Sequence, residues 1–321
     1  MNRIYRHIWS KALGCVIVVP ECVRGGGGKK TGRRTWVTAL LAGVALSGVS
    51  AEAALADTSW IGAVDNNWSN AGNWDNGLRG AGHTAIVNGT VAPITVDGAT
   101  HPFGSSMYIG TGSHDGSVSV VNGATLSDAH ILLGVHDSVT GLLTVSGTGS
   151  TVSIFGELGL GWGGSGEILV ENGGRVDSQG QVYIGRYEAG SGTITVTGPD
   201  SYFVGQNTYL GGAYDSSQGT LNLLDGGTFH TGNGTLRIAN SGGSTGTLNI
   251  GNGGAAGVLS ASTASFGSGT GVINFNHNEA AYGFATSITG SGTVNVIAGT
   301  TLLSGSNTYS GGTTVSAGTL I

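Results

Sequence analysis

A motif that recurs about every 25 residues after residue 103 constrains the fold of this chain more than any other feature. Each copy is a glycine followed within a few residues by two apolar side chains in alternation, and successive copies are 25, 25, 26, 27, 27, 25 and 21 residues apart. The motif glycines are Gly116, Gly141, Gly166, Gly192, Gly219, Gly246, Gly271 and Gly292. Self-similarity at a fixed period of this length indicates one structural unit that is stacked many times.

A second motif, apolar-x-apolar-Gly, precedes most copies of the first and keeps the same period. The alternation in both motifs has period 2, which is typical of β-strands with one buried face. A third short alternation completes the unit, so we expect three short strands in each. The copies of the second motif begin at Met107, Ile131, Leu158, Val182 and Thr208, with a weaker copy at Leu236.

The constant length of the unit decides between two arrangements of these strands. Antiparallel hairpins would pair neighbours within a unit and would tolerate units of any length. A coil in which each strand stacks on its counterpart one unit away requires a constant length. The sequence therefore predicts an all-β fold, a parallel β-helix with rungs of about 25 residues and about nine rungs in residues 104–321.

Composition supports this fold and excludes other classes of protein. The chain has 63 glycines without the strict third-residue period of collagen, and it is too apolar, at 39% hydrophobic residues, for a disordered chain. Charge and cysteine content exclude two kinds of partner. Residues 57–321 contain four basic and sixteen acidic residues, a net charge of −12. Nucleic-acid binding needs clustered cations, so a nucleic-acid partner is excluded. Both cysteines, Cys15 and Cys22, precede residue 57, so the repeats form neither a disulfide nor a thiolate metal site.

Residues 1–56 have the pattern of an export leader, and the leader is the only place where we expect a helix. Basic residues precede an apolar run that starts at Thr35 and closes on the small residues of Ala54-Leu55-Ala56. We expect signal cleavage between Ala56 and Asp57, with a cut after Ala53 as the alternative. The apolar run is shorter than the roughly 20 residues that a membrane-spanning helix needs.

Four segments carry a resemblance to a known family. The first 24 residues, with MNRIYR and the following Ile8-Trp9, closely resemble the extended signal peptide region (ESPR) of Gram-negative type V secretion proteins. The opening WIGAVDNNWSNAGNWDNG from Trp60 and the repeat GLLTVSGTGSTVSI from Gly141 resemble autotransporter passenger domains. Residues 303–320 are similar to the autotransporter-associated β-strand repeat.

The resemblance implies a right-handed β-helix that is displayed on the outer membrane and cell surface or released, most often as a non-catalytic adhesin or a biofilm and aggregation factor. It implies two partners for export, the inner-membrane machinery and an outer-membrane β-barrel translocator, and a host or bacterial surface ligand. No barrel segment is present in residues 1–321. We therefore keep open a truncated or split autotransporter fragment, which would stay periplasmic without a barrel.

On this interpretation the chain has three parts: a leader at 1–56, an N-terminal cap of the β-helix at 57–103 and the passenger repeats at 104–321. Trp60, Trp68 and Trp74 lie in the expected cap among asparagines and aspartates. Exposed tryptophans of this kind stack on sugar rings. An uncapped end rung invites strand addition, however, so we favour a role in covering the end of the coil.

One polar column is expected to stabilise the coil. Four asparagines fall at the same place in consecutive repeats, so their amides are expected to form a hydrogen-bonded ladder. These residues are Asn222, Asn249, Asn274 and Asn295.

A corner of the repeats is acidic, which raises the question of a calcium site. Stacked carboxylates bind Ca²⁺, but the Gly-rich calcium nonapeptide is missing and the register of the acids drifts, so we expect a solvated acidic edge. These acids are Asp115, Asp137, Glu188 and Asp215.

We expect neither catalysis nor a cofactor. Only Arg79, Arg175, Arg186 and Arg237 remain as basic residues after residue 56. A β-helical polysaccharide-acting enzyme, which needs carboxylates and basic residues together in a cleft, is therefore the weaker alternative.

Overall fold

The computed structural model describes residues 5–10, 15–20, 57–98, 100–212, 214–232 and 234–321. Residues 5–10 and 15–20 form strands β1 (Tyr5–Ser10) and β2 (Cys15–Pro20), which pair antiparallel. The helix expected in the leader lies outside the described residues. None of the described helices is long and apolar enough to span a membrane.

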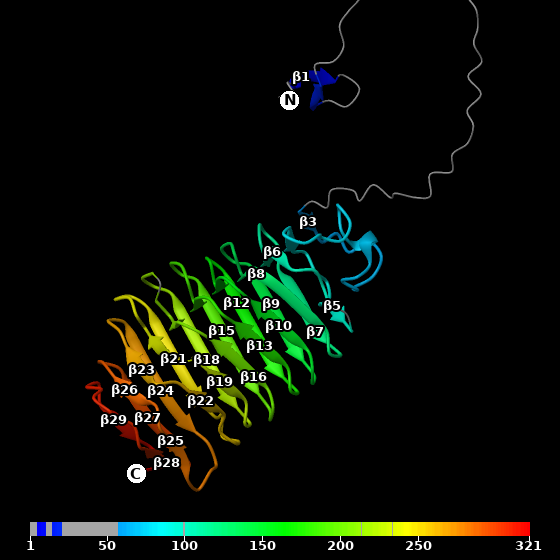
Figure 1. The fold of residues 1–321 in the computed structure, drawn as a ribbon. Helices are drawn as coiled ribbons and strands as arrows, with labels where there is room; N and C mark the ends of the chain where they lie inside the picture. Colours follow the sequence, from blue (N-terminus) through cyan, green and yellow to red (C-terminus); the bar gives the residue numbers. More distant parts are fainter. Residues whose placement is uncertain (1–4, 11–14, 21–56, 99, 213, 233) are drawn as a thin grey trace, which may run out of the picture. The chain divides into compact units, whose positions relative to one another are not determined.

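Residues 57–321 form a parallel β-solenoid, which confirms the fold expected from the repeats (Figure 1). One face is a ten-stranded sheet in which each strand pairs in parallel with its counterpart one rung away. Nine of its strands follow residue 104, as the period predicts. The strands are β5 (Ile94–Asp97), β7 (Gly116–Val121), β9 (Thr140–Ser146), β12 (Ser165–Glu171), β15 (Ser191–Thr197), β18 (Gln218–Leu224), β21 (Thr245–Ile250), β24 (Thr270–Asn276), β27 (Thr293–Ala298) and β29 (Thr313–Val315).

The second and third strands of the rungs belong to a fifteen-stranded sheet. The long strand β8 (Thr125–Leu133) joins its two series, because its first half pairs with β10 and its second half with β11. The second-strand series continues as β10 (Thr151–Ile154), β13 (Arg175–Ser178), β16 (Tyr202–Gly205), β19 (Thr228–His230) and β22 (Val258–Ser260). The third-strand series is β3 (Thr58–Ser59), β4 (Thr84–Val87), β6 (Gly104–Ile109), β11 (Leu158–Leu160), β14 (Val182–Ile184), β17 (Thr208–Leu210), β20 (Thr235–Ile238), β23 (Thr263–Phe266) and β26 (Ser287–Thr289).

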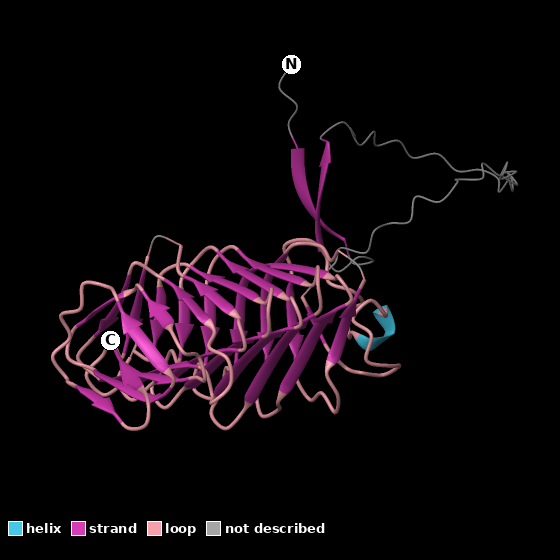
Figure 2. Ribbon diagram, turned by 90° about the horizontal axis from the view of Figure 1, so that it is seen from below, coloured by secondary structure: helices cyan, strands magenta, loops and turns pink. Residues whose placement is uncertain are grey.

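The two ends of the solenoid differ. A small sheet of β25 (Tyr282–Phe284), β28 (Thr300–Leu303) and β30 (Thr319–Leu320) continues the coil at the C-terminal end. At the other end, the single described helix is the 3₁₀ turn η1 (Ala71–Asn73) (Figure 2). Strands β4 and β5 already pair with β6 and β7, so the coil begins inside the segment 57–103.

The alternation within each strand builds one continuous core. In the rung of β9, β10 and β11, for example, the inward side chains are fully buried aliphatic residues, while the residues between them face outward. These inward residues are Leu143, Val145, Val152, Ile154, Leu158 and Leu160. Burial of apolar area of this kind in every rung is the dominant favourable contribution to folding.

Left-handed backbone residues make the corner between the third strand and the next rung. The glycine that ends the second sequence motif has a positive φ there, 62° at Gly134 and 71° at Gly161. Ala239, in the weaker copy of the motif, has the same kind of conformation, with φ 51°. The recurring glycine therefore marks a corner that most side chains adopt only with strain.

Candidate functional site

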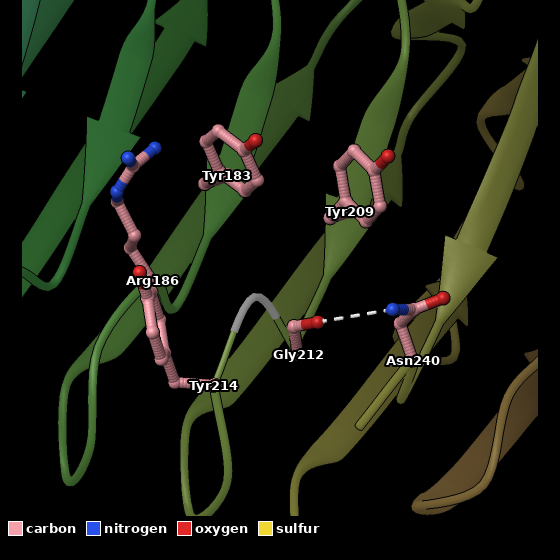
Figure 3. Close-up of a pocket in the computed structure, with 6 residues that line it drawn as sticks. All are labelled: Tyr183, Arg186, Tyr209, Gly212, Tyr214 and Asn240. Carbon is pink, nitrogen blue, oxygen red and sulfur yellow. Dashed lines mark hydrogen bonds between the residues drawn. The ribbon is translucent and has the colours of Figure 1, made fainter.

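Two tyrosines from neighbouring rungs stack on the outer face of the third-strand series. Tyr183 on β14 pairs in register with Tyr209 on β17, and their rings are 5.1 Å apart and inclined by 19°. The Arg186 guanidinium lies 4.3 Å from the Tyr183 ring centroid, on the side away from Tyr209 (Figure 3). Arg237 on β20 lies 5.1 Å from the Tyr209 ring. The four side chains therefore form a row of cation–π and stacking contacts along the coil.

A second aromatic group lies on the corner loops beside this row. Tyr187 and Tyr214 stack with centroids 4.5 Å apart, and Trp162 meets Tyr187 edge-on at 4.9 Å. Gly159 of β11 leaves room for the indole, because a Cβ at this position would lie 2.6 Å from Trp162 Nε1. We call the whole cluster the aromatic–arginine face; it comprises Trp162, Tyr183, Arg186, Tyr187, Tyr209, Tyr214 and Arg237.

The aromatic–arginine face borders two hollows. The first has a volume of about 220 Å³ and is open to solvent, and Asn240 Nδ2 donates a hydrogen bond to the Gly212 carbonyl at its edge (Figure 3). The second has a volume of about 190 Å³ and lies over the preceding rungs. Tyr183, Arg186, Tyr209, Gly212, Tyr214 and Asn240 line the first hollow, and Ser106, Tyr108, His130, Leu132, Glu157 and Trp162 line the second.

An ion pair connects the linings of the two hollows. Arg186 Nη1 lies 2.5 Å from Glu157 Oε1, and both side chains are mostly buried. Arg186 Nε and Trp162 Nε1 are buried donors with no hydrogen-bond acceptor among the described residues. Burial raises the pKa of the Tyr183 hydroxyl, with Arg186 acting in the opposite direction, so this phenol is neutral near pH 7. Its hydroxyl donates to Gln181 Oε1 and is left as an acceptor.

The arginines of the solenoid differ in how their charges are balanced. Arg79 bonds to the buried Asp128, Arg175 pairs with Asp177 and Arg186 pairs with Glu157. Among the described side chains, no carboxylate lies within ion-pair distance of the fourth arginine, Arg237. Arg237 is thus a cation with no counter-ion in the described part of the chain, although residues 57–321 have a net charge of −12.

The four asparagines of the predicted ladder lie side by side on the ten-stranded sheet. The side-chain amides of the last three donate to the Oδ1 of the asparagine one rung earlier, at 2.8 Å from Asn249, 2.8 Å from Asn274 and 2.9 Å from Asn295. Asn222 Nδ2 donates to Thr195 Oγ1 at 3.1 Å. A hollow of about 360 Å³ borders the ladder, but the amides there already bond to one another.

The three tryptophans of the expected cap are buried at the N-terminal end of the coil. Trp60, Trp68 and Trp74 are 7%, 3% and 3% exposed, and Trp74 meets both other rings edge-on. Trp74 Nε1 donates to the Trp68 carbonyl at 2.9 Å. Because the three rings are buried, none of them has a face open to a sugar. They cover the N-terminal end of the hydrophobic core.

Ala56 of the expected cleavage site lies outside the described residues. Asp57 is exposed, and its Oδ1 accepts a hydrogen bond from the Thr84 N–H at 2.8 Å.

At the acidic corner, one of the four carboxylates bonds to the backbone of the next rung. Asp115 Oδ1 accepts the Thr140 N–H at 2.6 Å. Within the part of the chain that the structure describes, no group of three or more His, Cys, Asp or Glu residues is arranged to hold a metal ion.

Sequence reasoning missed the aromatic–arginine face, although one signal for it was present. The middle position of the second motif is tyrosine in the copies at Met107, Val182 and Thr208. Stacking in register would have placed Tyr183 beside Tyr209. The contacts of Arg186, Trp162 and Tyr214 come from loop conformations, which the period does not specify.

Two family models match the ends of the chain. The extended signal peptide of the type V secretion system matches residues 1–50, and the passenger-associated-transport-repeat matches residues 298–321. Searches of the curated proteins and of the solved structures found no match. The leader, the C-terminal repeat and the β-solenoid agree with the family that the sequence resembles. The chain is an autotransporter passenger of the type V secretion class, exported to the cell surface or the extracellular space.

Proposed function

We propose that this passenger is a non-catalytic adhesin that attaches cells to a polymeric surface ligand through the aromatic–arginine face. The observation that carries the proposal is the row of Arg186, Tyr183, Tyr209 and Arg237 beside two hollows on successive rungs. Tyrosine and arginine are the residue types that contribute most to binding at protein surfaces. A site that repeats along the coil suits an extended ligand better than a small molecule.

The lining of the hollows favours binding over hydrolysis. Hydrolysis of a glycosidic bond typically uses two carboxyl groups that flank the bond. Among the described residues that line the two hollows, Glu157 is the single carboxylate. Its charge is paired with that of Arg186.

Adherence of coated beads tests the proposal. Beads that carry the exported chain are expected to adhere to epithelial cells or to a biofilm matrix, and the double variant Tyr183→Ala/Tyr209→Ala should lose most of that adherence. Tyr202→Ala is the matched control, because Tyr202 also faces outward under an arginine, but on the second-strand series. Beads that fail to adhere, or equal adherence of the double variant and the native chain, would refute the proposal.

A further inference from the structure

The two stacked tyrosines of the row, Tyr183 and Tyr209, do not offer their ring faces to a ligand. One face of Tyr183 is covered by Arg186 and the other by Tyr209, while the outer face of Tyr209 is covered by Arg237. The two tyrosines therefore present ring edges to the hollow, and both hydroxyls point the same way, away from Gly212 and Asn240 in the view of Figure 3. A ligand that binds here needs many hydrogen-bonding groups rather than a flat apolar surface.

The polar groups at the first hollow suit a polyhydroxylated ligand. The Tyr183 hydroxyl donates to Gln181 Oε1 and keeps its acceptor capacity, while the Tyr209 hydroxyl both donates and accepts. The Gly212 carbonyl is occupied by Asn240 Nδ2 and Ser241 Oγ, and Asn240 keeps its Oδ1 and a second N–H for a ligand. These groups come from three rungs, β14, β17 and β20 with their corner loops. Their spread along the coil fits successive units of one sugar chain.

The positive charge of the arginines favours a sugar chain that carries anionic groups. A guanidinium binds a carboxylate or sulfate in a bidentate manner, and such charge-assisted hydrogen bonds are about twice as strong as neutral ones. The charge of Arg186 is used by Glu157. Arg237 stands over Tyr209 at the end of the row and has no ion-pair partner among the described residues, so an anion bound there would be its counter-ion.

From these contacts we infer that the aromatic–arginine face binds an acidic polysaccharide, with an anionic group of one sugar on Arg237 and hydroxyls of neighbouring sugars on Tyr183, Tyr209 and Asn240. The inference rests on the proposed adhesive function and names its ligand. Bacterial polyuronates and sulfated host glycans share this chemistry.

Binding of defined polymers to the immobilised exported chain tests the inference. The probes are polygalacturonate, which has carboxylates alone, heparin, which adds sulfates, and dextran, which is neutral. One or both of the acidic polymers should bind at least about tenfold more tightly than dextran, and the preferred polymer identifies the source. Loss of one charge-assisted bond of roughly 1.5–3 kcal/mol corresponds to at least about a tenfold change in Kd.

Matched arginine variants separate the anion contact from general effects. Arg237→Gln should weaken binding of the acidic polymer at least about tenfold and leave dextran binding unchanged, and Arg237→Lys should fall between Arg237→Gln and the native chain. Arg175→Gln should leave binding unchanged, because Arg175 lies over Tyr202, away from the face. Circular dichroism of each variant verifies the fold.

The experiments distinguish failure of the proposed adhesive function from failure of the acidic-polysaccharide inference. If the beads adhere but acidic polymers bind no better than dextran, or Arg237→Gln binds them like the native chain, the acidic-polysaccharide inference is wrong and the adhesive role stands. If neither adherence nor polymer binding depends on Tyr183 and Tyr209, both proposals are wrong.

Discussion

At the scale of single residues, the most consequential contact of the solenoid that the repeat does not explain is a buried ion pair. Arg79, from the segment before the first complete rung, bonds in a bidentate manner to Asp128 of β8, and its Nη2 lies 2.8 Å from Asp128 Oδ2. Asp128 is fully buried. Burial raises the pKa of its carboxyl, and Arg79 opposes this effect. The pair ties the N-terminal segment to the coil across 49 residues.

Removal of Arg79 alone should strongly destabilise the fold. Arg79→Met leaves a buried carboxylate without a partner, so we expect the free energy of unfolding near pH 8 to fall by about 3–5 kcal/mol. The loss should be smaller at pH 5, because a carboxyl with a raised pKa is stabilising when protonated and loses that contribution as the pH rises. Urea unfolding at both pH values measures the effect. The double variant Arg79→Met/Asp128→Leu should recover most of the stability, and a single-variant loss below about 1 kcal/mol would contradict the expectation.

His277 makes the stability depend on pH in the opposite direction. The ring is fully buried, its Nδ1 accepts the Glu279 N–H at 3.2 Å, and Nε2 therefore donates to Thr301 Oγ1 at 3.0 Å. Burial lowers the pKa of His277, while Glu279 opposes the shift. Below about pH 6.5, the unfolded chain takes up the proton first, so the free energy of unfolding should decrease as the pH falls.

Thermal unfolding between pH 7.5 and 5.5 measures this dependence. We expect the native chain to lose stability across that range and His277→Gln to show a shallower slope, since the amide does not titrate. His101, whose pKa burial also lowers, accounts for part of the remaining slope. Identical slopes for the native chain and His277→Gln would rule out His277 as the titrating group.

At the scale of elements, the glycine that opens each repeat is required by close packing rather than by backbone conformation. Gly141, at the start of β9, has no positive φ, but a Cβ there would lie 2.1 Å from the Ile109 carbonyl oxygen of the preceding rung. Gly123, in a turn, shows the opposite case, with φ 76° and no atom closer than 4.0 Å.

Alanine at these two glycines separates the two effects. Gly123→Ala should cost about 1–2 kcal/mol from left-handed strain. Gly141→Ala should cost about 3 kcal/mol, because it overpacks the contact between rungs and the backbone must move. Chemical denaturation of both variants measures the loss of unfolding free energy. A loss at Gly141 no larger than that at Gly123 would show that the backbone between rungs moves at little cost.

At the scale of the whole molecule, the chain is a type V passenger and reaches the outside through the inner-membrane export machinery and an outer-membrane translocator.

The stability of the coil depends on the contacts between neighbouring rungs. A central strand such as β15 bonds to β12 and β18 on its two sides, whereas β29 bonds to one of the described strands, β27. Stacked repeats are stabilised largely by such interfaces.

Hydrogen exchange should therefore vary along the coil. We expect the amides of β12, β15 and β18 to exchange most slowly, those of β29 and β30 to exchange fastest, and the end near Trp68 to be intermediate because the tryptophans cover it. Mass spectrometry of peptides after deuterium labelling measures the gradient. Equal protection of β15 and β29 would mean that the solenoid opens in a single step.

The sequence by itself determined the period, the three strands of each rung, the parallel stacking and the export leader. Each of these follows from local alternation and spacing, and the register of the asparagine column follows from the same period. Only the tertiary structure decided which outward side chains meet. Arg79 and Asp128 are 49 residues apart, and the row that ends at Arg237 depends on loop conformations as well as on stacking. A repeat fixes where each strand lies, because the strands must pair in register, but the paths of its corner loops are set by side-chain packing between rungs.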